Sequence, residues 1–411
     1  MRRGLAALVA AACVAAVAAP SALAHGGTRV ATVETGGYIA RVDALLVRLS
    51  PARTVVDFTT YLRDRRTGAP VSGADVRVTA KTPDGQFGPL RALPSGNTYE
   101  VLVPISNPRQ WRQIRLHTAI SGPAGAASFG YAPPSLASDW RVEPVVAAGC
   151  LLALLLFFHG FVRLRRRGRK DLAGWGRAAL FVSAVAMTYL ALDSPLDAIA
   201  DDYLLSAHML EHVVIGDLAI ALAMLAVRGP LIFFLLPPAV LSPLARSRPV
   251  RAFLHWLTAP WVALLVWTAA MWAWHVPRFY DYAATHQGAH NLEHLSFMLG
   301  GILVWNLLID PAHTRRLTVP GRIMLAVAVF LLGDPVMATL FSGGANYPHY
   351  AAQPDRLLGI GPRVDQRLAG SVMLVEQILT LGTCCAVLLW PYLREGRLGP
   401  EESAVSGSGS L

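Results

Sequence analysis

The chain has 411 residues, of which 54% are hydrophobic and 15% charged, and its formal net charge is +10. This composition excludes a soluble protein built around one core and is typical of a membrane protein. The positive charge comes mostly from arginine, and its placement along the chain is more informative than its sum.

The N-terminus has the pattern of an export signal. Two arginines follow Met1, an apolar run extends to about Pro20, and the small residues of Ala22-Leu23-Ala24 come next. We therefore predict a signal peptide over residues 1–24, with His25 as the first residue of the mature chain. A free amino group beside an imidazole chelates Cu(II), and whether His25 binds metal is left open.

Residues 25–135 have a soluble, β-like character. Short segments of alternating or β-branched apolar residues are separated by turn signals such as Pro83-Asp84-Gly85. This spacing predicts an exported β-sandwich domain. The predicted strands are 38–49, 54–62, 75–80, 99–103 and 114–120. The stretches Gly68 to Val76 and Gly96 to Tyr99, followed by Trp111, resemble the exported immunoglobulin-like domains of the YtkA and FixH kind.

Long apolar runs occupy residues 142–393 and predict seven transmembrane helices, because most are near the 20 or so residues that span hydrocarbon. The runs are 142–162, 175–192, 203–227, 256–275, 291–310, 321–341 and 368–391. A further run, 231–236, is too short to span and is expected at the inner surface. The predicted fold class is thus a polytopic all-α membrane protein with an N-terminal exported β-sandwich.

Arginine clusters follow the first, third, fifth and seventh runs, whereas the loops between them carry aspartates and histidines. The positive-inside rule therefore places the β-domain outside a bacterial plasma membrane and the C-terminus in the cytoplasm. Residues 394–411, rich in glycine and serine, are expected to form a disordered cytoplasmic tail. The lipid bilayer is an expected partner, and nucleic acid is not.

The sequence H-x-x-E-H occurs twice, at 208–212 and at 290–294, each near the start of an apolar run. Residues four apart share one face of a helix, so each motif presents two imidazoles together. Titratable groups inside a membrane are costly and normally face a bundle interior, where they are functional. The two glutamates, Glu211 and Glu293, are expected to orient or neutralise histidines.

The predicted topology gathers further ligands at the same membrane face. His275 ends the fourth run, Met209 follows His208, and His286 continues the spacing of the second motif backwards. With no C-x-x-C pair, a metal must be held by histidine, methionine or carboxylate. Imidazole with thioether suits copper, whereas imidazole with carboxylate suits zinc or iron. The candidate ligands are His208, Met209, His212, His275, His290 and His294.

Four separated motifs resemble the CtaG family of cytochrome c oxidase assembly factors, caa-type branch, over residues 175–393. They are Ser206-Ala207-His208-Met209 with His212, Trp274-His275 with Pro277, His290 with Glu293-His294-Leu295-Ser296-Phe297, and Asp365-Gln366 with Ala369-Gly370. The resemblance implies a non-enzymatic membrane protein that helps deliver copper to the oxidase. Its partners would be oxidase subunits and other copper chaperones. The β-domain lies outside the family core.

Three other functions stay open. H-x-x-E-H is also the zinc signature of inverzincin proteases, with glutamate as general base, although duplication in two helices favours one shared site. Histidines facing each other from two helices can also hold a b-type haem. Asp217, Asp334 and Glu376 within the runs indicate either interhelical hydrogen bonds or the proton path of a transporter.

Overall fold

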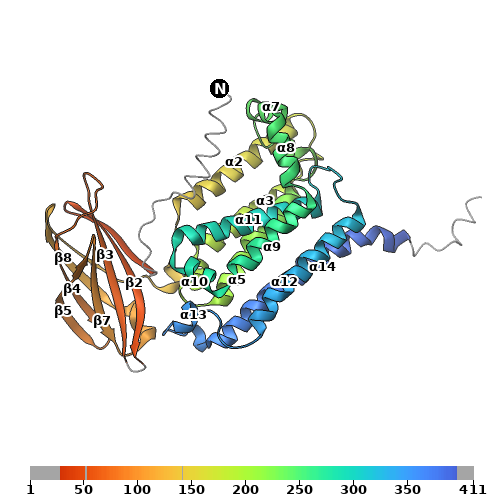
Figure 1. Ribbon diagram of the computed structural model, residues 1–411. Coiled ribbons are helices and arrows are strands. Elements are labelled where there is room, and N and C mark those ends of the chain that lie inside the picture. The colour runs from red at the N-terminus through yellow and green to blue at the C-terminus, as the bar shows by residue number, and fades with distance from the viewer. Residues whose placement is uncertain (1–27, 51–52, 141, 396–411) are drawn as a thin grey trace, which may run out of the picture.

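The computed structural model describes residues 28–50, 53–140 and 142–395. The predicted signal peptide, His25 and residues 396–411 of the predicted tail lie outside the described residues. Figure 1 shows a domain of β-sheets followed by a bundle of long helices.

The first part of the chain forms two antiparallel sheets with one core between them. The first sheet has the order β1 (Thr28–Thr35), β2 (Tyr38–Ser50), β3 (Arg53–Asp64), β7 (Thr98–Ile105), β6 (Leu93–Ser95). The second has the order β5 (Gly85–Arg91), β4 (Asp75–Thr82), β8 (Arg115–Gly122), β9 (Gly125–Tyr131). All five predicted strands are present, and β1, β5, β6 and β9 are additional to them.

Alternation of buried and exposed residues explains which strands could be predicted. In β4 every second side chain, from Val76 through Val78 to Ala80, is buried between the sheets, as the period of two requires. Strands β5 and β9 lie at the edges of the second sheet and consist largely of exposed or small residues. Edge strands bury little apolar surface, so their sequences lack the alternation of apolar and polar residues from which the other strands were predicted.

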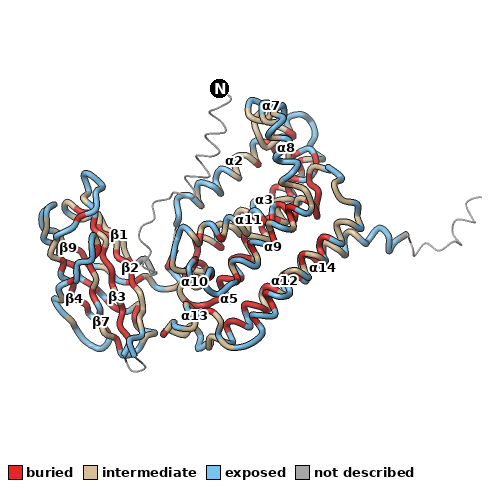
Figure 2. The backbone as a smooth tube through the Cα atoms, in the orientation of Figure 1, coloured by how far each residue is buried: buried red, intermediate tan, exposed pale blue. Residues whose placement is uncertain are grey.

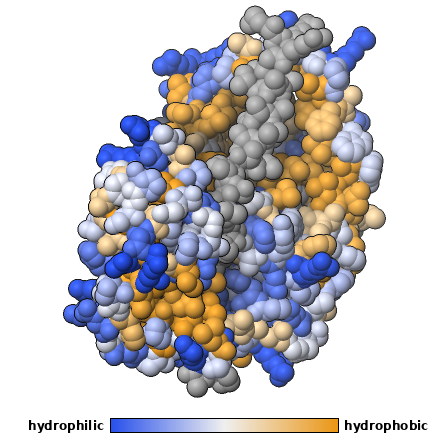
Figure 3. Space-filling model, turned by 60° about the vertical axis from the view of Figure 1, so that its left-hand side comes forward, coloured by the Kyte–Doolittle hydropathy of each residue, from blue (hydrophilic) through white to orange (hydrophobic). Residues whose placement is uncertain are grey.

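Residues 142–395, as the structure describes them, contain six helices long and apolar enough to cross a membrane, or seven if one bent pair forms a single span. They are α2 (Pro144–Arg166), α3 (Trp175–Asp193), Leu205–Ala226, α11 (Gln287–Ile309), α12 (Val319–Phe341) and α14 (Pro362–Glu395). Large apolar side chains on their outer faces are exposed, for example Leu155 on α2 and Val387 on α14. Much of the surface at the right of Figure 3, where the helices lie, is apolar. The predicted fold class is confirmed.

The fourth predicted run, 256–275, is not one straight helix. The chain forms α8 (Arg248–Leu257) and α9 (Pro260–Trp274), which meet at 62°. Pro260 has no N–H to continue the helix and disfavours a helical residue before it. Fifteen residues make α9 about 22 Å long, short of the roughly 30 Å of hydrocarbon. The short run 231–236 contains the end of the 3-10 helix η4 (Gly229–Phe233), and α7 (Pro238–Arg246) follows it.

Three short helices, α4 (Pro195–Asp202), α10 (Pro277–Thr285) and α13 (Pro348–Ala352), connect the long ones. Figure 1 places α10 and α13 at the end of the bundle nearest the sheets. The two domains touch at Tyr203, which ends α4. Its hydroxyl accepts hydrogen bonds from Trp111 Nε1 at 3.1 Å and Arg112 Nε at 2.9 Å. Tyr203 thus connects the β-domain to the residues that begin the third span.

The third span crosses α11 at two glycines. It consists of α5 (Leu205–Val213), the π-helical turn η3 (Val214–Leu218) and α6 (Ala219–Ala226). A Cβ atom on Gly301 of α11 would overlap the carbonyl oxygen of Gly216 in η3. Small residues allow membrane helices to approach this closely. In Figure 2 buried stretches run along α5, α9 and α11.

We predict that Gly301→Ala destabilises the bundle. The added methyl group has no space beside the Gly216 carbonyl, and overpacking of this kind costs about 1–3 kcal/mol or more. Thermal unfolding in detergent, followed by loss of the monodisperse peak, measures the effect. Gly382→Ala on α14 is the control, because nothing lies within 4 Å of a Cβ there. Equal melting temperatures for both variants would contradict the close crossing.

Candidate metal centre

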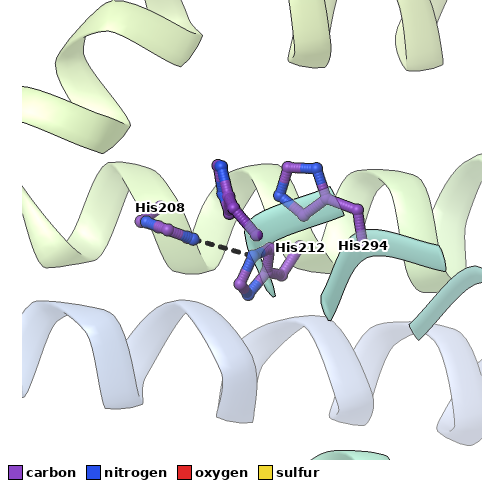
Figure 4. A group of neighbouring side chains, drawn as sticks. His208, His212 and His294 are labelled. Carbon is purple, nitrogen blue, oxygen red and sulfur yellow. Dashed lines mark hydrogen bonds between the residues drawn. The ribbon is translucent and has the colours of Figure 1, made fainter. Parts of the chain in front are cut away.

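Four histidines from two helices converge at one point. His208 and His212 come from α5, and His290 and His294 come from α11. One ring nitrogen of each lies within 4.8 Å of those of the other three. Figure 4 shows the first pair and His294 turned toward one another between the helices. We call these four residues the histidine tetrad.

The sequence explains the convergence in two steps. Each H-x-x-E-H motif lies in the first turns of its helix, so its two histidines project from one face at the same end of the bundle. The crossing of Gly216 and Gly301 then holds the two faces together. His208, His212 and His290 are buried, with 1%, 6% and 6% of their surface exposed.

The two glutamates serve the opposite motif rather than their own. Glu211 Oε1 lies 3.3 Å from His294 Nε2, and Glu293 Oε1 lies 3.9 Å from His212 Nε2. Both glutamates are fully buried. This reciprocal arrangement joins the two motifs into a single site with approximate two-fold character, as the duplication of the motif predicts.

Tyr350 of α13 fixes the orientation of His208, and no sequence motif identifies it. Its hydroxyl donates to the carbonyl oxygen of Ala200 at 2.7 Å and lies 2.7 Å from His208 Nδ1. Burial raises the pKa of Tyr350 well above its usual value, so the phenol stays protonated. Since its proton is used on Ala200, the phenol oxygen accepts from His208 Nδ1–H, which leaves the lone pair on Nε2 facing the tetrad.

Several buried nitrogens of the tetrad lack a hydrogen bond. Among the described residues, His212 Nδ1, His290 Nε2 and His294 Nε2 have none, and the last two have carboxylate oxygens of Asp201 and Glu211 at 3.8 and 3.3 Å. His208 Nε2 and His212 Nε2 lie 2.8 Å apart, a distance at which one must donate to the other. Leaving buried polar groups unpaired costs about 1–3 kcal/mol each. A cation bound by these nitrogens would remove that cost, so the site fits a metal ion.

Two predicted ligands lie outside the tetrad. Met209 is 1% exposed and packs in a core cluster with Leu205 and Tyr280. His275 follows α9, and its Nδ1 donates to the carbonyl oxygen of Met271 at 2.7 Å. Both line a cavity that also borders His212.

His286 does not extend the second motif. The helix α11 begins only at Gln287, and His286 has an extended backbone at its N-cap. Its ring stacks on exposed Tyr282, with ring centroids 3.9 Å apart. The sequence does not show where α11 begins, because periodicity alone locates a helix start only to within a few residues.

Asp365 and Gln366 do not reach the tetrad and instead bind backbone groups of the segments around it. Asp365 accepts from the backbone N–H groups of Leu205 and Ser206 at 2.8 and 3.0 Å and from Ser206 Oγ at 2.6 Å. A carboxylate placed there caps the start of α5. Gln366 accepts from Asn346 N–H and donates to backbone carbonyls of Leu340 and Gly344.

The remaining acidic residues within the spans differ from one another. Asp217 accepts from Trp305 Nε1 at 2.9 Å and lines the same cavity as Glu376. Asp334, by contrast, is exposed on α12. The three do not form a continuous row, so this structure does not assemble them into a proton path.

Comparisons with known proteins agree with this architecture. The model of the family described as cytochrome c oxidase caa3 assembly factor matches residues 155–395, more than half of the chain. Uncharacterized proteins of Mycobacterium bovis and Mycobacterium tuberculosis are each 27% identical to it over 237 residues. That match covers 52% of this chain and 34% of each relative, so the matched region is about a third of the relatives' length. No solved structure matches. By its matched residues the chain belongs to the cytochrome c oxidase caa3 assembly factor family.

Proposed function

We propose that this protein handles copper for the assembly of a respiratory cytochrome c oxidase, binding the ion as cargo at the histidine tetrad. The family supports a role in oxidase assembly. The observation that supports copper is the convergence of four imidazoles, three buried and one half-buried, with ring nitrogens within 4.8 Å of one another and no thiolate within the group. Nitrogen-only sites of this kind suit copper and zinc.

Nearby carboxyl groups support a cation in the tetrad. Four neutral imidazoles contribute no charge, whereas Glu211, Glu293 and Asp201, when ionised, contribute negative charge within 4 Å of tetrad nitrogens. In a low-dielectric interior an uncompensated ion is expensive, so negative charge close by stabilises a bound cation. The two glutamates are therefore proposed to neutralise the bound ion and not to act as bases.

The position of the tetrad supports exchange at the outer face. The motifs lie at the starts of α5 and α11, the end of the bundle that carries α10, α13 and the β-domain. Under the orientation expected from the arginine distribution, this end faces outward. Tyr203, which binds Trp111 and Arg112 of the β-domain, is five residues from His208. We propose that the β-domain guides copper between the tetrad and oxidase subunits or other copper chaperones.

Two alternatives find less support in the geometry. Catalytic zinc keeps an open position for water, whereas the four nitrogens of the tetrad would occupy all four positions of a tetrahedral zinc ion. A haem would need a slot between α5 and α11, and the crossing of Gly216 with Gly301 leaves no such separation near the motifs.

We predict that His208→Ala combined with His294→Ala abolishes copper binding at the tetrad, seen as loss of the nitrogen-bound copper, because each helix then supplies a single imidazole. Metal content of the detergent-solubilised protein measures the binding, and oxidase copper content and activity in the expressing strain measure the function. His286→Ala is the matched control, since that histidine is exposed and outside the tetrad. Normal oxidase copper and activity in the double variant would reject the proposal. Zinc in the wild-type protein would instead favour the protease.

We also predict that Tyr350→Phe weakens copper binding by about 10–100-fold, the usual effect of removing a group that orients a metal-binding histidine. Without the phenol oxygen, His208 Nδ1–H loses its acceptor and the ring can turn away. Competition with a chromophoric copper chelator measures the dissociation constant. Tyr282→Phe on α10 serves as control, because Tyr282 is exposed and stacks on His286 instead. Equal affinities for the two variants would show that Tyr350 has no orienting role.

A further inference from the structure

A second set of metal-binding atoms lies beside the tetrad, around a cavity of about 40 Å³. A cavity holds one water molecule at roughly 10–15 Å³ by the same measure, so this one is large enough for a single ion. His212 borders both the cavity and the tetrad. The cavity is also lined by groups that bind metals elsewhere in proteins, namely Met209, Met271, His275, Met373 and Glu376. We call this space the thioether cavity.

The three methionines come from three different helices. Met209 lies on α5, Met271 on α9 and Met373 on α14, and the first and last are 1% and 3% exposed. Buried methionine usually fills a core. Here, however, the three line one cavity together with two imidazoles. Thioethers are soft ligands, and thioether with imidazole but without thiolate selects Cu(I) among common biological metals.

His275 is prepared as a ligand. Its Nδ1–H donates to the carbonyl oxygen of Met271, which fixes the tautomer and leaves the lone pair on Nε2. That Nε2 atom is buried and has no hydrogen-bond partner among the described residues. A backbone carbonyl on the far nitrogen is the usual support for a metal-bound histidine. Only 7% of the His275 surface is exposed, so bulk water does not readily satisfy this nitrogen.

The acidic residues of the cavity provide negative charge for a cation. Asp217 and Glu376 both line the cavity. Trp305 Nε1 donates to Asp217 at 2.9 Å, a contact that stabilises the ionised carboxylate. A carboxylate at the cavity wall offsets the charge of a bound cation where no water can do so.

We propose that the thioether cavity is a second copper site, distinct from the tetrad, which binds Cu(I) through His275 and the thioethers of Met209, Met271 and Met373. It builds on the proposed copper handling but does not depend on the tetrad being occupied. His212 borders both sites, so they adjoin each other, and the proposal concerns binding at the cavity and no transfer between the two. No change in oxidation state is part of this proposal.

The test is anaerobic loading of the detergent-solubilised full chain with Cu(I), followed by metal analysis and X-ray absorption at the copper edge. The wild-type protein should bind Cu(I) with sulfur scattering. The triple variant M209L/M271L/M373L keeps side-chain volume, so it should fold but lose the sulfur signal and about half of the copper. H275A should lower Cu(I) affinity by at least about 10-fold. Met337→Leu is the control, because Met337 is also buried but does not line the cavity.

The outcomes separate this proposal from the previous one. Nitrogen-only scattering in the wild-type protein, unchanged in the triple variant, would overturn the thioether cavity and leave the tetrad standing. The H208A/H294A variant should keep the sulfur scattering, and the triple Met-to-Leu variant should lose it. That pair of results would support an independent cavity site. If the triple variant does not fold, the single variant H275A, followed by the same affinity measurement, decides: unchanged affinity overturns the proposal.

Discussion

The site depends on one close contact, the crossing of η3 and α11 where Gly301 lies against the carbonyl of Gly216. Two helices carrying larger residues there would stand further apart, and the four imidazoles could not reach a common point. The π-helical turn begins two residues after His212, so the helix changes its winding immediately beyond the ligands. Such turns are often found at functional sites, because they redirect side chains without ending the helix.

A second layer at the same end of the bundle supports this contact. Asp365 of α14 caps α5, Tyr350 of α13 orients His208, and Tyr203 binds the β-domain. These groups come from loops and helices far apart in the chain. Each of these three residues contacts or belongs to the segment at the start of α5. A displacement of the β-domain would therefore shift residues that lie within a few positions of the tetrad. This linkage gives the β-domain a physical route to influence the histidine tetrad.

The sequence predicts those elements in which apolar or ligand residues recur at a regular spacing or in long runs. Alternation revealed β4 and β8, and long apolar runs revealed six helices. The i, i+4 spacing of the duplicated motif predicted which histidines would share a face. Pro260 marks where the fourth run breaks. The length and apolar character of that run nevertheless concealed the 62° bend between α8 and α9.

What the sequence could not predict depends on tertiary contacts. The role of Tyr350 follows from the placement of α13 beside α5, and no local pattern identifies it. Similarly, Glu211 and Glu293 are adjacent to histidines of their own motifs, yet they contact histidines of the other. Met209 and His275 were predicted together with the tetrad, whereas the structure places both around the neighbouring cavity.

The separation of these ligands has a chemical consequence. Imidazole nitrogens without thioether suit a divalent ion such as Cu(II), whereas thioethers with imidazole suit the softer Cu(I). Placing both sets around His212 would let a single protein accommodate copper in either charge state without exposing it to hydrocarbon, where an unbalanced charge is most costly. A carrier that must accept an ion and then release it gains from two adjoining sites of moderate affinity, because a single site strong enough to capture copper would also hold it back.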